Sequence, residues 1–308
     1  MLLVAGFWPV IKNRGLEHTI GGHLLSAYLC FVLLLAPLWF FGFDLADVLR
    51  KRLRSPASRI FAAVVFTVPY CVYAIPRHEF RWSSALEMLA IPLAISVLFE
   101  FSHLQQKFTW QDAVVLFGLA AILQTHLLAS AWPYQGLGSL PKLYLADVAL
   151  YSYLVVRNLQ KMGYSLVPQT SAVAIGVREW LLFFPFAMAV GYSLHFIRFT
   201  PRGHSPGQIA ATSIGTLLLI ALPEELYFRG ILQNLLEALA GRTRALAIAS
   251  VLFGLSHYPK GAVFNWRYVI MAAIAGVFYG RAWRDRRQIL ASSITHTMVD
   301  VVWALWFR

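Results

Sequence analysis

The sequence predicts an all-α fold, a polytopic transmembrane helical bundle of about eight to ten spans. Of the 308 residues, 59% are hydrophobic and only 13% are charged, whereas soluble domains average about 45–50% apolar and about 25% charged residues. Phe, Tyr and Trp are abundant, as expected of chains whose aromatic rings anchor at membrane interfaces. Apolar runs near the length that crosses a bilayer as a helix recur along the chain. The class is therefore a multi-pass integral membrane protein.

Ten apolar segments are candidate spans, and they occupy residues 23–43, 59–76, 84–101, 112–131, 142–157, 179–198, 208–238, 245–258, 267–283 and 289–307. A span needs roughly 17 to 25 residues. Segments 142–157 and 245–258 are short by this measure, so the expected number of spans is eight to ten. Segment 208–238 is long enough for a tilted helix that continues past the membrane edge.

The chain shows no internal repeat and no linker long enough to separate two soluble domains. We expect one membrane-embedded bundle with two parts. Residues 1–200 form N-terminal transmembrane helices whose role the sequence does not assign. Residues 201–308 form a helical core that carries the polar motifs described below.

The net charge and its distribution along the chain indicate what the protein contacts. The 26 Lys and Arg against 14 Asp and Glu give a net charge of +12. In a soluble protein this excess would suggest nucleic-acid binding, but here the basic residues gather in short gaps between apolar runs, as at Arg50-Lys51-Arg52. Loop charge of this kind sets topology and contacts anionic lipid head groups. We expect the lipid bilayer, and not nucleic acid, as the partner, and for a bacterial chain the cytoplasmic (inner) membrane as the location.

The first polar motif, Pro-Glu-Glu-Leu-Tyr-Phe-Arg-Gly at residues 223–230, directly follows an apolar run. Each charge at the bilayer centre costs at least about 2.5 kcal/mol, so such groups persist where they are paired, hydrated or used. Glu225 and Arg229 are four residues apart and can form an ion pair on one helix face. Glu224 is rotated from Glu225 by about 100°, which leaves it available as a general base. The alternative is a helix end that extends its charges to the interface.

Two further motifs lie in the later apolar segments. Phe253 and His257 end one of them, and His296 and Asp300 share a face of the last. Taken singly, His257 is typical of an interface, and the other pair is typical of hydrogen bonds between helices. Converging with Glu224 on one cavity, they would supply a base, an orienting histidine and an oxyanion donor for adding water to an amide. No HExxH or Gly-x-Ser-x-Gly motif occurs, so we expect no metal and no cofactor.

The three motifs in this order, EExxxR (Glu224, Glu225, Arg229), FxxxH (Phe253, His257) and HxxxN/D (His296, Asp300), resemble the CPBP family of intramembrane glutamic endopeptidases. That family includes the eukaryotic type II CAAX prenyl protease and bacterial proteins linked to bacteriocin processing and self-immunity. The resemblance covers roughly residues 208–308, and the first 200 residues match no motif of the family.

The resemblance implies a helical bundle with a water-filled cavity in its C-terminal helices. It implies that Glu224 activates the attacking water, that His257 shares the proton or orients the water, and that His296 and its i+4 partner stabilise the oxyanion. Glu225 and Arg229 would be the supporting ion pair, and Phe253 would pack within the motif.

One position departs from the family's eukaryotic protease, which carries Asn where this chain has Asp300. An Asn amide can donate a hydrogen bond to an oxyanion, whereas an ionised Asp cannot. Two roles stay open for Asp300: a protonated carboxyl in an apolar site, or a partner that orients His296 as the acid of a dyad.

The sequence thus predicts an intramembrane endopeptidase, CAAX protease-like, that hydrolyses a peptide bond in a membrane-anchored protein or hydrophobic peptide by glutamate-activated water. The alternative is a non-catalytic membrane binding or immunity protein that holds a peptide in the same cavity. A transporter that relays protons through buried Glu and His is a third possibility, but it would be expected to show an internal repeat.

Overall fold

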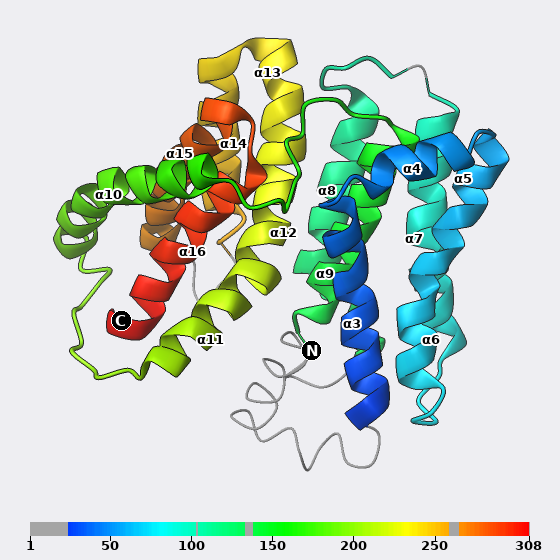
Figure 1. Ribbon diagram of the computed structural model, residues 1–308, viewed down its shortest axis with the longest axis horizontal. Coiled ribbons are helices and arrows are strands. Elements are labelled where there is room, and N and C mark those ends of the chain that lie inside the picture. The colour runs from blue at the N-terminus through cyan, green and yellow to red at the C-terminus, as the bar shows by residue number, and fades with distance from the viewer. Residues whose placement is uncertain (1–23, 103, 133–137, 259–264, 308) are drawn as a thin grey trace. The chain divides into compact units, whose positions relative to one another are not determined.

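The computed structural model describes residues 24–102, 104–132, 138–258 and 265–307, and every regular element in these ranges is a helix (Figure 1). Extended backbone pairs there as a single isolated antiparallel bridge between Phe199 and Phe307. The predicted all-α fold is confirmed. Each of the ten predicted apolar segments coincides with helical structure.

The chain divides into two compact units, Met1–Gln105 with Thr109–Gln160, and Gln106–Phe108 with Lys161–Arg308. The described helices of the first unit are α3 (Leu24–Phe41), α4 (Leu45–Arg52), α5 (Pro56–Ala62), α6 (Val68–Ala74), α7 (Trp82–Glu100), α8 (Trp110–Gln124) and α9 (Leu140–Tyr151). A 3₁₀ turn (Ala63–Thr67) joins α5 to α6, a second one (Leu127–Ser130) follows α8, and a π turn (Ser152–Val156) extends α9.

Helix α9 forms the interior of the first unit. It packs against α3 and α8, and its residues from Leu143 to Tyr151 are all buried. The Tyr144 hydroxyl donates to the Met88 carbonyl of α7 at 2.6 Å. Pro92 has no N–H and cannot donate to that carbonyl four residues earlier. Tyr144 therefore supplies the hydrogen bond that the proline removes.

The second unit contains α10 (Thr170–Ser193), one long helix from Pro206 to Ala240, α14 (Arg242–Leu255), α15 (Trp266–Arg286) and α16 (Ile289–Trp306). Helix α10 packs against α15 and α16, and α14 packs along α15. These contacts group α10 with the C-terminal helices, whereas the sequence-based division at residue 200 left it with the N-terminal ones.

The long helix changes its pitch around the first motif. It runs as α11 (Pro206–Thr216), a π turn (Leu217–Ala221), α12 (Leu222–Glu225), a longer π segment (Leu226–Gln233) and α13 (Asn234–Ala240). Pro223 lies between the two π segments and cannot donate to the carbonyl of Leu219. Wide π turns of this kind are frequent at functional sites.

Within the described ranges, five helical stretches are long and apolar enough to cross a membrane: Pro56–Ala74, Trp82–Glu100, Thr170–Ser193, Pro206–Ala240 and Ile289–Trp306. A sixth counts if α3 and α4, bent by 88°, form one span. The number is below eight because α8, α9 and α14 are too short and α15 carries several charges toward its end. The protein is an integral membrane protein.

Helix α10 begins at Thr170, well before the predicted start at residue 179. In the sequence, the charged pair Arg178-Glu179 lies at the start of the predicted span. In the structure, Glu179 is fully buried and pairs with Arg178 at 2.8 Å and with Arg281 of α15 at 3.1 Å. The two arginines neutralise the carboxylate inside the unit.

Candidate active site

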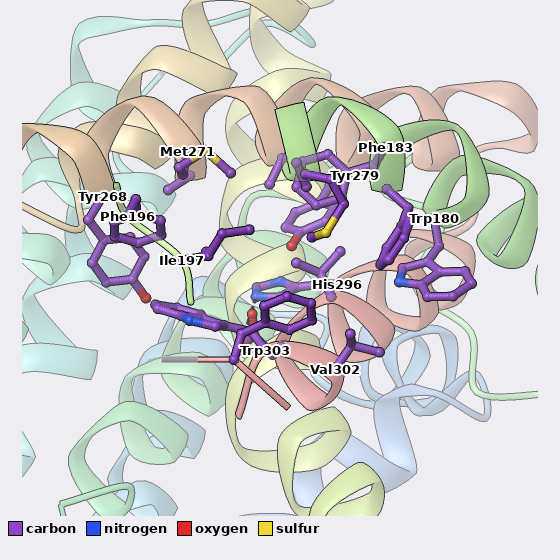
Figure 2. A pocket seen from close by; sticks show the side chains of 18 of the residues that line it. Trp180, Phe183, Phe196, Ile197, Tyr268, Met271, Tyr279, His296, Val302 and Trp303 are labelled. Carbon is purple, nitrogen blue, oxygen red and sulfur yellow. Dashed lines mark ion pairs between the residues drawn. The ribbon is translucent and has the colours of Figure 1, made fainter. Parts of the chain in front are cut away.

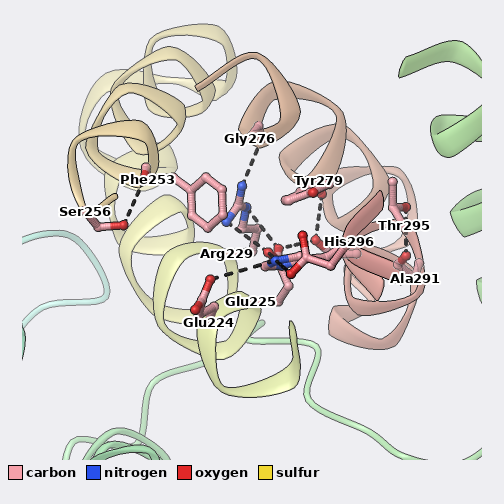
Figure 3. Close-up of polar contacts among 12 residues, drawn as sticks. Glu224, Glu225, Arg229, Phe253, Ser256, Gly276, Tyr279, Ala291, Thr295 and His296 are labelled. Carbon is pink, nitrogen blue, oxygen red and sulfur yellow. Dashed lines mark hydrogen bonds and ion pairs between the residues drawn. The ribbon is translucent and has the colours of Figure 1, made fainter. Parts of the chain in front are cut away.

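The Glu225 carboxylate on α12 is the centre of a buried polar network (Figure 3). Arg229 donates from Nη1 to Oε1 at 3.1 Å, and its Nε lies 3.1 Å from Oε2. Both side chains have no solvent exposure. The i,i+4 spacing therefore places the two opposite charges in contact where neither could be buried alone.

Arg229 is also held from α14 and α15. Its Nη2 donates to the Gly276 carbonyl at 3.0 Å, and its guanidinium carbon lies 4.5 Å from the centroid of the Phe253 ring. A Cβ at Gly276 would lie 3.3 Å from this Nη2 and 3.2 Å from the Cα of Ser250. Because Gly276 has no side chain, α15 can lie close to α14 and to Arg229. The planar guanidinium can then donate to the Gly276 carbonyl and stack on the Phe253 ring face.

His296 of α16 connects the two adjacent glutamates. Its Nδ1 lies 2.8 Å from Oε1 of Glu225, and its Nε2 lies 3.8 Å from Oε2 of Glu224 and 3.5 Å from Oδ2 of Asp300. An ionised carboxylate can only accept a hydrogen bond, so Nδ1 carries a proton and donates it to Glu225. Nε2 is then the atom that faces the other two carboxylates.

The two glutamates differ in their surroundings. The Glu225 side chain is 0% exposed, whereas that of Glu224 is 15% exposed. Glu225 receives hydrogen bonds from Arg229 and His296. Glu224 lies on a different side of the same helix, beside Nε2 of His296 (Figure 3).

Two aromatic rings fix the plane of the His296 imidazole. Tyr279 stacks on it, with 4.5 Å between ring centroids and 16° between planes. Phe253 meets it edge-on at 5.6 Å and 90°. Phe253 also contacts the ring of His257 at 4.8 Å. The phenylalanine of the second motif thus touches the arginine of the first motif and both histidines.

His257 lies just after the last turn of α14 and is buried. Its Nδ1 is 2.9 Å from the carbonyl oxygen of Phe253. This carbonyl also accepts from the Ser256 hydroxyl at 2.7 Å, and a carbonyl oxygen can only accept. Nδ1 of His257 therefore carries the proton, and in the neutral ring Nε2 is left as an acceptor.

A cavity opens beside these residues, between α10, α14, α15, α16 and the segment after α10. Its walls are mainly aromatic and aliphatic, and Figure 2 shows Trp180, Phe183, Tyr268 and Trp303 around His296. His257, His296 and Asp300 all line it. With Phe253, the structure therefore brings four of the predicted site residues to one cavity, and His296 links this cavity to the glutamates.

One of three comparisons with known proteins gives a match. A family model described as type II CAAX prenyl endopeptidase Rce1-like matches residues 206–302. Residues 206–302 are similar to this family. The matched range begins with α11 and ends within α16, so it contains every motif residue of the site. No curated protein and no solved structure matches the chain.

Within the Rce1-like region, Asp300 is the most exposed of the motif carboxylates, with 30% of its side chain accessible. It lies on the cavity side of His296. Among the described residues, no group of three or more His, Cys, Asp or Glu is arranged to hold a metal ion.

Sequence reasoning missed three contributors to the Rce1-like site. Ser292 donates a hydrogen bond to Glu225, Tyr279 stacks on His296, and Gly276 supplies a carbonyl to Arg229. The position of Ser292, one turn before His296 on the same helix face, could have indicated its role. Tyr279 and Gly276 come from α15, which carries no motif, so no pattern in the sequence pointed to them.

Proposed function

We propose that this protein is an intramembrane endopeptidase that hydrolyses a peptide bond in a membrane-anchored protein or hydrophobic peptide, with Glu224 as the general base. The unequal surroundings of the two glutamates carry this proposal. Glu225 is held by Arg229 and His296 and serves as an anchor. Glu224 is partly accessible beside Nε2 of His296 and can exchange a proton with water.

In the proposed reaction, Glu224 takes a proton from a water molecule while the water oxygen attacks the carbonyl carbon of the scissile amide. The carbonyl π electrons move to its oxygen and form the oxyanion of a tetrahedral intermediate. When the C–N bond breaks, Glu224 returns the proton to the leaving amine. The carboxylate thus acts first as base and then as acid, and the enzyme is regenerated.

The two histidines have separate roles in this proposal. His257 has its Nδ1 proton committed to Phe253, so its Nε2 can accept a hydrogen bond from the attacking water and orient it. His296 has its Nδ1 proton committed to Glu225. As an imidazolium it also donates from Nε2, the atom that faces the cavity side, and stabilises the oxyanion.

The cavity suits an apolar substrate. Two of the helices that line it, α10 and α16, are candidate membrane spans, its walls are mainly aromatic and aliphatic, and the polar side chains His257, His296 and Asp300 also line it. Ligand sites of this form bind apolar groups and use a few polar groups for orientation. For a bacterial chain, the substrate would be anchored in the cytoplasmic membrane.

Asp300 favours a second candidate function, a non-catalytic binding or immunity protein that holds a peptide in the same cavity. An ionised carboxylate 3.5 Å from Nε2 of His296 would repel a developing oxyanion. In that case the cavity would bind a peptide without cleaving it.

Substrate trapping tests the proposed function. Membranes that contain the Glu224→Gln protein are compared with wild type, and peptides retained by the purified protein are identified by mass spectrometry. We expect the variant to retain a protein that wild type releases in two fragments. Asp285→Asn, a change at a carboxylate 41% exposed and paired with Arg178, is the matched control and should behave as wild type. Intact cleavage by the Glu224→Gln protein would exclude Glu224 as the base.

A further inference from the structure

Ser292 is a buried serine on α16, one turn before His296. Its hydroxyl donates to Oε2 of Glu225 and also lies 2.8 Å from the carbonyl oxygen of Tyr279. A hydroxyl has one proton and serves one acceptor at a time. Hydrogen bonds to an ionised carboxylate are roughly twice as strong as those to a neutral group, so Glu225 is the favoured acceptor.

The bond from Ser292 completes the contacts of the Glu225 carboxylate. Oε1 receives Nη1 of Arg229 and Nδ1 of His296. Oε2 receives the Ser292 hydroxyl and lies 3.1 Å from Nε of Arg229. The terminal torsion of a glutamate is soft and has no sharp preferred angle. Donors on both oxygens are therefore needed to fix the plane of the carboxylate.

The plane of Glu225 matters because it directs His296. Oε1 must stay in line with Nδ1 if Nε2 is to face Glu224 and Asp300. Ser292 and His296 are four residues apart on one rigid helix, so both donors approach Glu225 from the same side.

We propose that Ser292 is a positioning residue of this site: it fixes the carboxylate plane of Glu225 and, through it, the orientation of the His296 ring. The consequence for turnover rests on the proposed function. The orientation of His296 does not, because it can be measured without a substrate.

Four variants of the full-length protein test the proposal. Ser292→Ala removes the donor, Ser292→Cys keeps nearly the same shape with a weak donor, and Ser292→Thr keeps the hydroxyl. Ser293→Ala is the matched control, because Ser293 is the next residue and equally buried, and its hydroxyl has no hydrogen-bond partner among the described residues.

The first measurement is ¹⁵N NMR of the histidine-labelled protein in detergent, with the His296 signals assigned by their absence in His296→Gln. In wild type, Nδ1 should show the shift of a protonated, hydrogen-bonded nitrogen. We expect Ser292→Ala and Ser292→Cys to move or broaden the His296 signals, and Ser292→Thr and Ser293→Ala to preserve them. Unchanged His296 signals in the Ala and Cys variants would overturn the proposal. If the Ala variant does not fold, the Cys variant decides.

The second measurement is turnover of a peptide found by substrate trapping. We expect kcat to fall about tenfold in Ser292→Ala and Ser292→Cys with KM little changed, since a charge-assisted hydrogen bond is lost without contact to the substrate. Ser292→Thr should recover most of the loss. Wild-type kcat in the Ala and Cys variants would refute the positioning role. If the wild-type protein cleaves no trapped peptide, the proposed function fails, and the NMR result still decides the role of Ser292.

Discussion

Nδ1 of His296 lies 2.8 Å from Oε1 of Glu225, although the two residues are 71 positions apart in the chain. This contact distinguishes two neighbouring glutamates that the sequence presents as equals. The glutamate that accepts from His296 and Arg229 is an anchor. The other, Glu224, lies 3.8 Å from the opposite nitrogen of the same ring.

This division predicts different outcomes for the same substitution at the two positions. Glu224→Gln should abolish hydrolysis and change the unfolding temperature little, because the side chain is partly exposed and near-isosteric. Glu225→Gln should destabilise the protein by about 3–5 kcal/mol, because Arg229 is left as an uncompensated buried charge. Thermal unfolding in detergent and a cleavage assay measure both. Equal loss of stability in the two variants would contradict the division.

Substitution of the two histidines distinguishes the endopeptidase from the non-catalytic binding protein. His257→Ala should lower turnover by about 10²–10⁴-fold, because a group that orients the water in proton transfer is removed. Binding of an uncleaved peptide should persist, since the cavity walls are mainly apolar. Isothermal calorimetry with the trapped peptide and a cleavage assay check the two parts. A cellular phenotype that survives His257→Ala and His296→Ala would favour the binding or immunity function.

Much of this arrangement was predictable from local sequence. Apolar runs of suitable length became helices, and the i,i+4 spacing of Glu225 and Arg229 produced an ion pair. These features depend only on the residue spacing within one helix, and that spacing can be read from the sequence.

Contacts between segments were not predictable in the same way. Ser292 and Gly276 reach the first motif only because α15 and α16 pack beside it. The start of α10 was missed because Glu179 is neutralised by an arginine from α15, Arg281. A charge buried by a distant partner looks like a helix end when one segment is considered alone.

Asp300→Asn tests whether Asp300 opposes catalysis as an ionised carboxylate or supports it by orienting His296. We expect the variant to cleave the trapped peptide faster than wild type, by up to about tenfold, because the amide can donate to the oxyanion that an ionised carboxylate repels. Steady-state kinetics with purified protein measure the change. Loss of turnover would instead assign Asp300, 3.5 Å from Nε2, as the group that orients His296.

Gly276→Ala should damage the site through packing alone. The added Cβ would lie 3.2 Å from the Cα of Ser250 and 3.3 Å from Nη2 of Arg229, so α14 and α15 must separate. We expect a loss of about 1–3 kcal/mol in unfolding free energy, the usual cost of overpacking. The control is Gly118→Ala in α8, where nothing lies within 4 Å of the new Cβ and the change should be neutral or stabilising by about 0.5–1 kcal/mol. Equal effects at both glycines would contradict close packing at Gly276.

The hydrogen bond from Tyr144 to Met88 can be tested by a double-mutant cycle with Pro92. Tyr144→Phe removes the hydroxyl that serves the buried Met88 carbonyl, so it should cost about 1–3 kcal/mol. In a Pro92→Ala background the new backbone N–H can donate to that carbonyl, because it lies four residues earlier in α7. Tyr144→Phe should then cost clearly less, and the difference between the two costs, measured by unfolding, is the coupling between Tyr144 and Pro92. Equal costs in both backgrounds would mean that the tyrosine stabilises the first unit by packing and not by replacing the donor that proline lacks.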